Sequence, residues 1–187
     1  MTGVQTCALP ISVFLSRLDK TPDEDLLTAA ATMLATFPNL GLTWADLDWL
    51  RGQTKLPILV KGVLTADDAA RALKHGMDGV IVSNHGGRQV DGAVGALDAL
   101  VEVRDALPEA VVLMDSGIRC GADVLKAMAL GADAVLLGRP YAYALAVGGQ
   151  RGVEALINNL MAEIDLNLAL AGGHSIRDLD RSWLTAA

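Results

Sequence analysis

Two kinds of segment alternate along the chain from Leu56 onward. Short apolar runs rich in Val, Ile and Leu end in Gly, Ser, Asn or Asp, and each is followed by a segment with a helical hydrophobic period. The apolar runs predict strands over residues 56–60, 79–82, 110–114 and 134–137. The other segments predict a helix capped by Thr65, helices over residues 95–107 and 121–130, and a long helix over residues 151–170.

This alternation predicts an α/β fold. Strands that are apolar on both faces and are separated by helices indicate parallel βαβ units with right-handed crossovers. Four such units within about 85 residues have the spacing of a (β/α)8 TIM barrel, of which they would form a partial barrel, about the last four βα units. An open doubly wound sheet fits the same periodicity and remains the alternative.

The chain divides into three segments in this interpretation. Residues 1–12 lack the pattern of a signal peptide and resemble the translation of a sequencing-adapter oligonucleotide, so we expect a non-native leader and a native start further upstream. Residues 13–55 form a lead-in, with an acidic helix expected over residues 22–37 and a short helix over residues 43–51. Residues 56–187 form the C-terminal half of the barrel.

Composition narrows the range of partners. The net charge is −7 with no basic block, which argues against nucleic acid and anionic membranes. No run approaches the roughly 18 uncharged apolar residues of a membrane-spanning helix. Cys7 and Cys120 form no pair suited to a disulfide framework or a thiolate zinc site, so we expect no metal and a cytoplasmic protein.

Every predicted strand is followed by a cation or potential cation. Lys61 follows the first strand, and the polar segments 83–88, 115–119 and 138–139 follow the other three. Loops after parallel strands converge on one end of a barrel, so these side chains are expected to meet there. Anion binding explains such a cluster in an acidic protein, although Lys61 taken alone is equally typical of a charge at the rim.

Two of these segments predict a phosphate site. Asp115-Ser116-Gly117-Ile118-Arg119 enters a helix, and would supply free N–H groups, a glycine for close approach and a guanidinium. Gly138-Arg139 adds a second glycine-backed cation at the neighbouring strand. An N-capping turn is the structural alternative for the first segment, but the pair of loops together favours phosphate.

His85 and Arg88 are separated by two glycines in Ser83-Asn84-His85-Gly86-Gly87-Arg88. The glycines let the backbone bend tightly near a ligand, and Arg88 offers a planar fork suited to a carboxylate. A histidine beside it can take a proton at neutral pH. A histidine hydrogen-bonded within its loop is the structural alternative, and the pairing with Arg88 favours the chemical role.

The remaining conspicuous residues have structural interpretations. His75 is expected to be a favourable charge at a helix end, next to Gly76. The others are expected to pack the interior or the short helix, and they are Met77, Met128, Trp44, Trp49 and Cys120.

Three stretches then resemble one known family. "LPILVKGV", "GVIVSNHGGRQVDG" and "MDSGIRCGADVLKAMALGADAVLLGRP" are similar to the FMN-dependent α-hydroxy acid dehydrogenases, over about residues 13–187. The SNHGGRQ motif is highly specific to that family. "FPNLGLTWADLDWLRGQTKLPILVKG" and Ser116, where many members have glycine, look most like the lactate 2-monooxygenase branch.

The resemblance implies a role for each matching position. His85 would be the base at the substrate's α-hydroxyl group, and Arg88 would pair with the substrate carboxylate. Lys61 would lie beside the flavin N1/C2 oxygen and Ser83 would contact the flavin ring. The ribityl chain and phosphate of FMN would be held by Asp115, Ser116, Gly117, Ile118, Arg119, Gly138 and Arg139.

The implied activity is FMN-dependent oxidation of a small L-2-hydroxy acid, lactate-like, to the 2-oxo acid or its decarboxylated product, with O2 as acceptor. The chain resembles only the C-terminal half of such an enzyme, so we expect the fragment to be inactive and the full-length protein to be a homo-oligomer. Two alternatives stay open: another FMN barrel, such as a type 2 isopentenyl diphosphate isomerase, and a non-catalytic half-barrel that binds phosphate or FMN.

Overall fold

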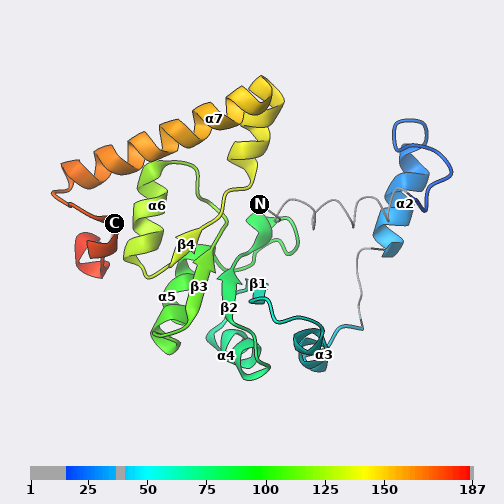
Figure 1. Cartoon of the computed structure of the whole chain (residues 1–187), viewed down its shortest axis with the longest axis horizontal. Coiled ribbons are helices and arrows are strands. Elements are labelled where there is room, and N and C mark those ends of the chain that lie inside the picture. Colours follow the sequence, from blue (N-terminus) through cyan, green and yellow to red (C-terminus); the bar gives the residue numbers. More distant parts are fainter. Residues whose placement is uncertain (1–15, 37–40, 186–187) are drawn as a thin grey trace. The chain divides into compact units, whose positions relative to one another are not determined.

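The computed structural model describes residues 16–36 and 41–185 (Figure 1). The chain divides into two compact units between Thr43 and Trp44. In the described part of the first unit, helix α2 (Leu26–Thr36) begins after Asp25, whose carboxylate accepts hydrogen bonds from the Thr28 amide at 3.1 Å and hydroxyl at 2.8 Å. The helix expected from residue 22 therefore starts later, and the expected leader lies outside the described residues.

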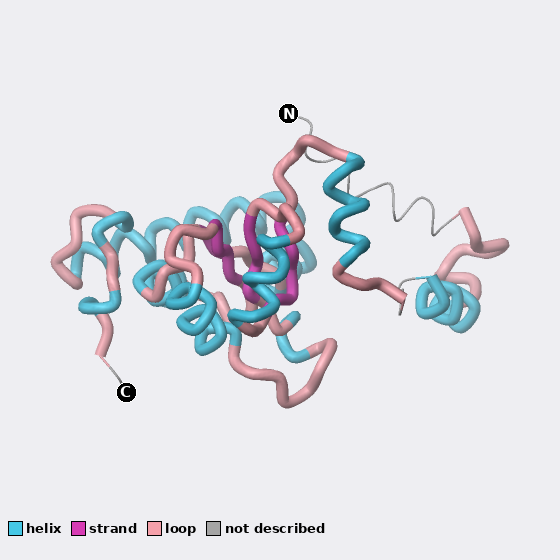
Figure 2. The backbone as a smooth tube through the Cα atoms, turned by 90° about the horizontal axis from the view of Figure 1, so that it is seen from below, coloured by secondary structure: helices cyan, strands magenta, loops and turns pink. Residues whose placement is uncertain are grey.

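Four parallel strands form the centre of the second unit. Strands β1 (Leu59–Val63), β2 (Gly79–Val82), β3 (Val111–Met114) and β4 (Ala134–Val135) lie side by side in chain order (Figures 1 and 2). A doubly wound sheet reverses its strand order at a switch point, whereas a barrel wall keeps chain order. The order among the described strands confirms the barrel-type arrangement.

Strand β1 departs from its predicted position. It begins at Leu59 rather than residue 56, because the backbone before it is bound by side chains: Arg51 donates to the carbonyl of Leu56 at 2.7 Å, and Asp78 accepts from the amide of Ile58 at 2.7 Å. Lys61 therefore lies within the strand and not after its end. The register slips between Lys61 and Val63, so that Gly62 forms a bulge.

Helices α4 (Ala66–Lys74), α5 (Ala96–Ala106) and α6 (Gly121–Ala129) connect consecutive strands, and helix α3 (Ala45–Gln53) precedes β1. The Thr65 hydroxyl caps α4 by accepting from the Asp68 amide at 3.2 Å, as predicted. Gly76 and Gly131 have positive φ where α4 and α6 end, as is common for glycines that close helices.

The core lies between the strands and these helices. Val80 and Val82 of β2 and Val112 and Met114 of β3 are buried against apolar residues of the helices, which include Ala69, Ala72, Ala99, Leu100, Val103, Val124 and Ala127. Met77 belongs to this core, as predicted, whereas Trp49 is 66% exposed and does not pack as predicted.

The opposite face of the sheet carries a different row of residues. Lys61, Ile81, Leu113 and Ala134 are paired across the four strands, outside the core cluster. Lys61 therefore points away from the helices, on the face that a closed barrel turns inward.

The same arrangement of aspartate hydrogen bonds occurs before two of the strands, β2 and β4. In Gly76-Met77-Asp78 and Gly131-Ala132-Asp133, the aspartate amide donates to a carbonyl of the preceding strand segment at 2.8 Å. The aspartate carboxylate accepts both from an amide of that segment and from an arginine, which is Arg51 for Asp78 and Arg104 for Asp133. Each arrangement fixes the position of one strand relative to its neighbour.

Helix α7 (Arg139–Leu170) begins twelve residues earlier than predicted. Glycines at 148, 149 and 152 interrupt the helical pattern in the sequence, and the helix kinks at Gly149, where φ is 57°. Its later part packs on α6, where Gly121 would leave no room for a Cβ against Glu163 and Ile164.

The expected polar tail folds into short helices η2 (Ile176–Asp178) and η3 (Arg181–Trp183). Arg181 forms an ion pair with Asp105 of α5 at 2.6 Å. No helix in the described part of the chain is long and apolar enough to span a membrane.

Candidate active site

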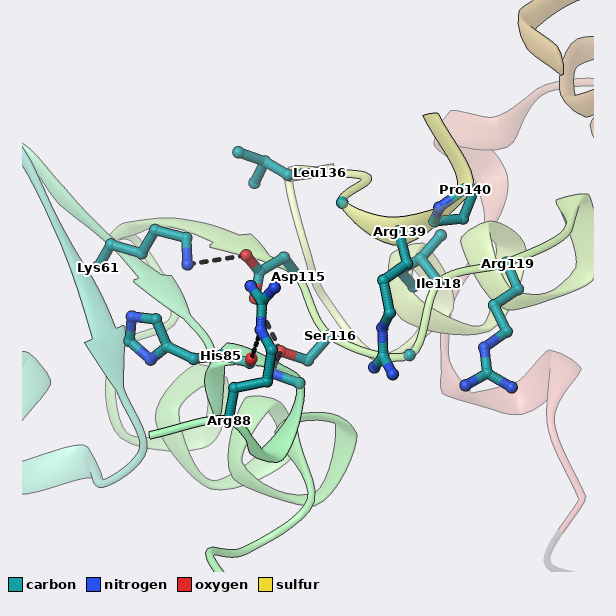
Figure 3. A pocket seen from close by; sticks show the side chains of 13 residues that line it. Lys61, His85, Arg88, Asp115, Ser116, Ile118, Arg119, Leu136, Arg139 and Pro140 are labelled. Atoms are coloured by element: carbon teal, nitrogen blue, oxygen red, sulfur yellow. Dashed lines mark hydrogen bonds and ion pairs between the residues drawn. The ribbon is translucent and has the colours of Figure 1, made fainter. Parts of the chain in front are cut away.

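A pocket lies where the strands end, and Figure 3 shows its lining side chains. It contains every residue proposed from the sequence except Ser83, which is fully buried and hydrogen-bonded to Lys61. Gly86, Leu136 and Pro140 also line it and were not anticipated. The lining comprises Lys61, His85, Gly86, Arg88, Asp115, Ser116, Gly117, Ile118, Arg119, Leu136, Gly138, Arg139 and Pro140.

Lys61 reaches the pocket from the inward face of β1. Its Nζ forms an ion pair with Asp115 Oδ2 at 2.8 Å and donates to Ser83 Oγ at 3.1 Å. The sequence had placed Lys61 and Asp115 at the same end of the barrel but had not paired them. Through these two contacts Lys61 of β1 joins Ser83, directly after β2, and Asp115, directly after β3.

Asp115 is held as a carboxylate. Partial burial opposes its ionisation, but hydrogen bonds from Lys61, Ser83 and Ser116, with the positive charge of Lys61, hold the pKa of Asp115 below its ordinary value. Lys61 and Asp115 therefore face the pocket as an ion pair, and the remaining side-chain charge there is cationic.

The loop after β2 carries His85 in the turn η1 (His85–Gly87). The Ser83 hydroxyl accepts from the His85 amide at 3.1 Å, and the Asn84 side chain accepts from the Gly86 amide at 3.0 Å. Gly86 and Gly87 have φ of 67° and 74°, which the tight turn requires. The paired glycines of the motif therefore serve the backbone, as predicted.

Gly62 makes room for the His85 ring. A Cβ at Gly62 would lie 2.8 Å from His85 Cε1, and Gly62 has a φ of 99° that disfavours other residues. The bulge in β1 and the position of the histidine are thus linked. Sequence reasoning missed this contact, for which the glycine directly after Lys61 was the only indication.

Among the described residues, the ring of His85 and the terminal guanidinium nitrogens of Arg88 have no partner and can contact a ligand. Arg88 Nε donates to the His85 carbonyl at 3.1 Å, which orients the guanidinium along the loop. Within residues 16–36 and 41–185, the His85 ring and the terminal nitrogens of Arg88 have no hydrogen bond or ion pair. Figure 3 shows both on the side of the pocket that holds Lys61 and Asp115.

The opposite side of the pocket is formed by two further arginines. Arg119 follows β3 and Arg139 begins α7, and Figure 3 shows both guanidinium groups together on that side. In the described structure neither side chain has a hydrogen-bonding or ion-pair partner. Gly86 approaches Arg139 so closely that a Cβ would lie 2.9 Å from Nη2.

The prediction that residues 115–119 supply free N–H groups at the start of a helix is partly wrong. At the start of α6, the amides of Arg119 and Cys120 donate to Asp123 Oδ2, and the amide of Gly121 donates to Glu163. These carboxylates cap the helix and would repel an anion there. Cys120 is half-buried at this cap.

Other amides remain open to a ligand. Among the described residues, the amides of Gly117, Ile118 and Arg139 have no acceptor, and the N-cap of α7, Gly138, makes no side-chain capping bond. A Cβ at Gly117 or Gly138 would meet nothing within 4 Å. The 117–118 turn and the start of α7, with Arg119 and Arg139 beside them, therefore form a candidate anion site.

His75, in contrast, has structural partners. Its Nδ1 lies 2.8 Å from Asp48 Oδ1, and its ring stacks on Trp44 at 6.1 Å between centroids. It joins α3 to the end of α4 and takes no part in the pocket. No group of three or more potential metal-binding side chains occurs in the described part of the chain.

Comparison with known proteins identifies the family that this fold and pocket represent. The sequence model of the FMN-dependent dehydrogenases matches residues 8–186, and the chain belongs to that family. This match decides between the two enzyme families considered from the sequence, in favour of the dehydrogenases.

Individual relatives agree with this assignment. The chain is 50% identical to an L-lactate oxidase of Nostoc over 154 residues, covering 82% of this chain and 42% of the relative. It is 42% identical to the human 2-hydroxyacid oxidase 1 over 170 residues, covering 89% and 46%. A mandelate oxidase variant solved with 2-hydroxy-phenylacetamide is 48% identical, with a TM-score of 0.72 over 75% of this chain and 42% of that one.

These figures show that the chain spans less than half the length of the relatives it matches. The structural similarity confirms a partial TIM barrel. One solved mandelate oxidase contains a monooxide FMN adduct. FMN is the cofactor of this family.

The residues present fit one part of FMN. The open amides at 117–118, the two glycines without neighbours and the unpaired Arg119 and Arg139 are suited to its phosphate. The pocket encloses about 80 Å³, below the roughly 300–1,000 Å³ of most ligand pockets. The described residues therefore form one wall of an FMN site and not its whole enclosure.

Proposed function

We propose that this chain supplies the phosphate-binding and acid–base half of an FMN-dependent enzyme that oxidises a small L-2-hydroxy acid to the 2-oxo acid. One observation carries the proposal: the His85 ring and the terminal nitrogens of Arg88, which have no partner among the described residues, line the same pocket as the candidate anion site in a chain of the FMN-dependent dehydrogenase family. The names of its relatives, which include an L-lactate oxidase and 2-hydroxyacid oxidases, support the substrate class.

On the cofactor side, the amides of Gly117 and Ile118, with Arg119 and Arg139, would hold the phosphate. Lys61 points to the inward face of the sheet and would place its positive charge beside the ring system. FMN, when bound, accepts the two electrons that leave the substrate. Ser83 and Asp115 hold Lys61 in place through their hydrogen bonds to its Nζ.

On the substrate side, the Arg88 fork would bind the carboxylate and so orient the hydroxyl-bearing carbon. His85 would take the hydroxyl proton as the carbon–oxygen bond becomes double. Over the whole reaction the hydroxy acid loses two electrons and two protons, and O2 gains them as hydrogen peroxide. The free ring of His85 supports this role, since no described group competes for its nitrogens.

A finer proposal concerns the product. The resemblance of Ser116 and of the sequence of residues 37–62 to the lactate 2-monooxygenase branch supports a decarboxylated product. In that outcome, hydrogen peroxide and the 2-oxo acid react before release and give the shortened carboxylic acid, CO2 and water. Acetate rather than pyruvate from L-lactate would support this branch, and equimolar pyruvate and peroxide would support a simple oxidase.

The first test measures FMN binding by the quenching of flavin fluorescence. Arg139→Ala should raise the dissociation constant about tenfold, because a charge-assisted hydrogen bond to phosphate is lost. Arg177→Ala, in the exposed tail, is the matched control and should leave FMN binding unchanged. Equal affinity of the Arg139 variant and the wild-type chain would refute the phosphate assignment.

The second test measures bleaching of bound FMN by L-lactate, glycolate or mandelate without oxygen. In a chain extended to the full length of its relatives, His85→Ala should abolish bleaching, and His174→Ala, at a histidine of the tail, should not. A second candidate function is FMN binding without turnover, which the single-walled pocket favours for this chain taken alone. Tight FMN binding with no bleaching by any 2-hydroxy acid would select that candidate.

A further inference from the structure

Two residues of the pocket have a strained backbone. Among the described non-glycine residues only His85 and Ser116 have positive φ, at 55° and 76°. A side chain rarely adopts this conformation, and such residues persist where surrounding contacts hold them. The two belong to loops after different strands, β2 and β3, and yet line the same pocket.

The Ser116 hydroxyl joins the two loops. It donates to Asp115 Oδ1 at 2.9 Å and accepts from the Gly86 amide at 3.2 Å; that amide also donates to Asn84 Oδ1 at 3.0 Å. The Gly86 amide directly follows His85, so this bond restrains the backbone that carries the histidine ring. The strained conformation of Ser116 is what brings its hydroxyl to this position.

A second serine makes the equivalent contact one residue earlier. The Ser83 hydroxyl accepts from the His85 amide at 3.1 Å, and Ser83 also hydrogen-bonds to Asp115. Two consecutive amides of the histidine loop are thus bound by two serine hydroxyls. Both hydroxyls contact the same carboxylate, which Lys61 holds by an ion pair.

We propose that Ser116 is a positioning residue for His85, and that Asp115 and Ser83 complete the same clamp. The Ser116 hydroxyl is committed to this protein contact on both its donor and its acceptor side, so its function is to fix the loop and not to hold the cofactor. This inference rests on the proposed function for the importance of His85, but the contact itself can be tested without it.

The test compares three chains without FMN: wild type, Ser116→Gly and Ser116→Ala. Glycine relieves the strained φ and alanine keeps it, but both remove the hydroxyl. The Gly86 amide would lose one of its two acceptors and keep Asn84 Oδ1. Its solvent-exchange rate, measured by ¹⁵N NMR, should therefore rise in both variants by up to about fivefold, the upper limit for the loss of one net hydrogen bond. Ser175→Ala is the matched control, because its hydroxyl accepts from the Arg177 amide at the same 3.2 Å in the tail.

In an FMN-loaded protein extended to the full length of its relatives, both Ser116 variants should lower the maximal rate of substrate-dependent flavin reduction about tenfold. Their FMN dissociation constant should stay within twofold of wild type. Unchanged Gly86 exchange in both variants would overturn the clamp. Weaker FMN binding without faster Gly86 exchange would also overturn it, and would assign Ser116 to the cofactor.

A uniform rise in exchange that includes the buried amide of Val112 would mean global loosening, and would likewise overturn a positioning role. The proposed function fails separately: a wild-type chain, extended to the full length of its relatives, that binds FMN but shows no reduction refutes catalysis, while the exchange data still decide the clamp.

Discussion

Gly62→Ala tests whether the bulge in β1 sets the position of the histidine. The added Cβ would lie 2.8 Å from His85 Cε1, whereas ordinary van der Waals contact begins near 3.4 Å. The ring therefore has to retreat by about half an ångström. It is half-buried and attached to a glycine-containing loop, so we expect the ring to move and the strand to stay.

The substitution has two separable effects. A left-handed conformation costs a non-glycine residue about 1–2 kcal/mol, and Gly62 has a φ of 99°. For a chain of this size the thermal midpoint should fall by about 2–8 °C. Displacement of the ring adds a functional loss, since a misplacement of about 1 Å at a reacting group costs about a hundredfold in rate.

Gly172→Ala is the matched control. Gly172 has a φ of 85°, and a Cβ there would meet nothing within 4 Å, so this variant has the backbone cost without the contact. Both variants should lose similar thermal stability, but only Gly62→Ala should shift the proton resonance on His85 Cε1 and slow FMN reduction. An unshifted His85 resonance in a folded Gly62→Ala chain would refute the reasoning.

Three further predictions follow from contacts in the structure. In a chain extended to the full length of its relatives, Arg88→Lys should raise KM for the 2-hydroxy acid about tenfold, because the fork to the carboxylate is lost; an unchanged KM contradicts this assignment. The pKa of Asp115 is lowered on folding, so its contribution to stability is present above the ordinary value of 3.8 and is lost as pH falls through the lower folded value. Asp115→Asn should therefore flatten the acid limb of the stability curve below about pH 4, and an unchanged limb would contradict the ion pair with Lys61. Arg104→Met should lower the free energy of unfolding by about 2–4 kcal/mol in urea, since three or more carbonyls lose their donor; Arg151→Met, on the exposed surface, is the control, and equal losses would refute the role of Arg104.

The fold was largely predictable because apolar strands and amphipathic helices alternate regularly along the sequence. Four apolar runs separated by helical segments allow few arrangements once right-handed crossovers are required. Strand boundaries were harder to predict, since they depend on distant side chains. Arg51 and Asp78 bind the backbone before Leu59, and no local pattern near residue 56 indicates that β1 begins three residues later.

The start of helix α7 was also not predicted correctly from the sequence. Glycine lowers helix propensity, and the glycines at 148, 149 and 152 lie around the start of the helix predicted over residues 151–170. In the structure the helix only kinks at Gly149, and it starts at Arg139, at the pocket. That start matters for function, because it turns a loop arginine into one held at a helix N-terminus.

The composition of the site was predictable, but its connections were not. Residue types after each strand indicated a cationic pocket, since strand ends converge whatever the details of packing. Which amides stay free is decided by Asp123 and Glu163, and Glu163 lies more than forty residues further along the chain. A sequence pattern that places cations at a helix start cannot reveal that the helix is already capped.

The backbone strain at His85 and Ser116 shows most clearly how contacts between loops override local sequence preference. Local preference favours glycine at position 116 and a relaxed residue at position 85, yet both residues have positive φ. The His85 amide donates to the Ser83 hydroxyl of its own loop, while the Ser116 hydroxyl donates to Asp115 and accepts from the Gly86 amide of the neighbouring loop. Local preference is overridden at the two points where one loop must be fixed against another, and those points carry the histidine. Packing of the core alone requires neither of them, so their strained conformations are best explained by the need to aim the His85 ring into the pocket.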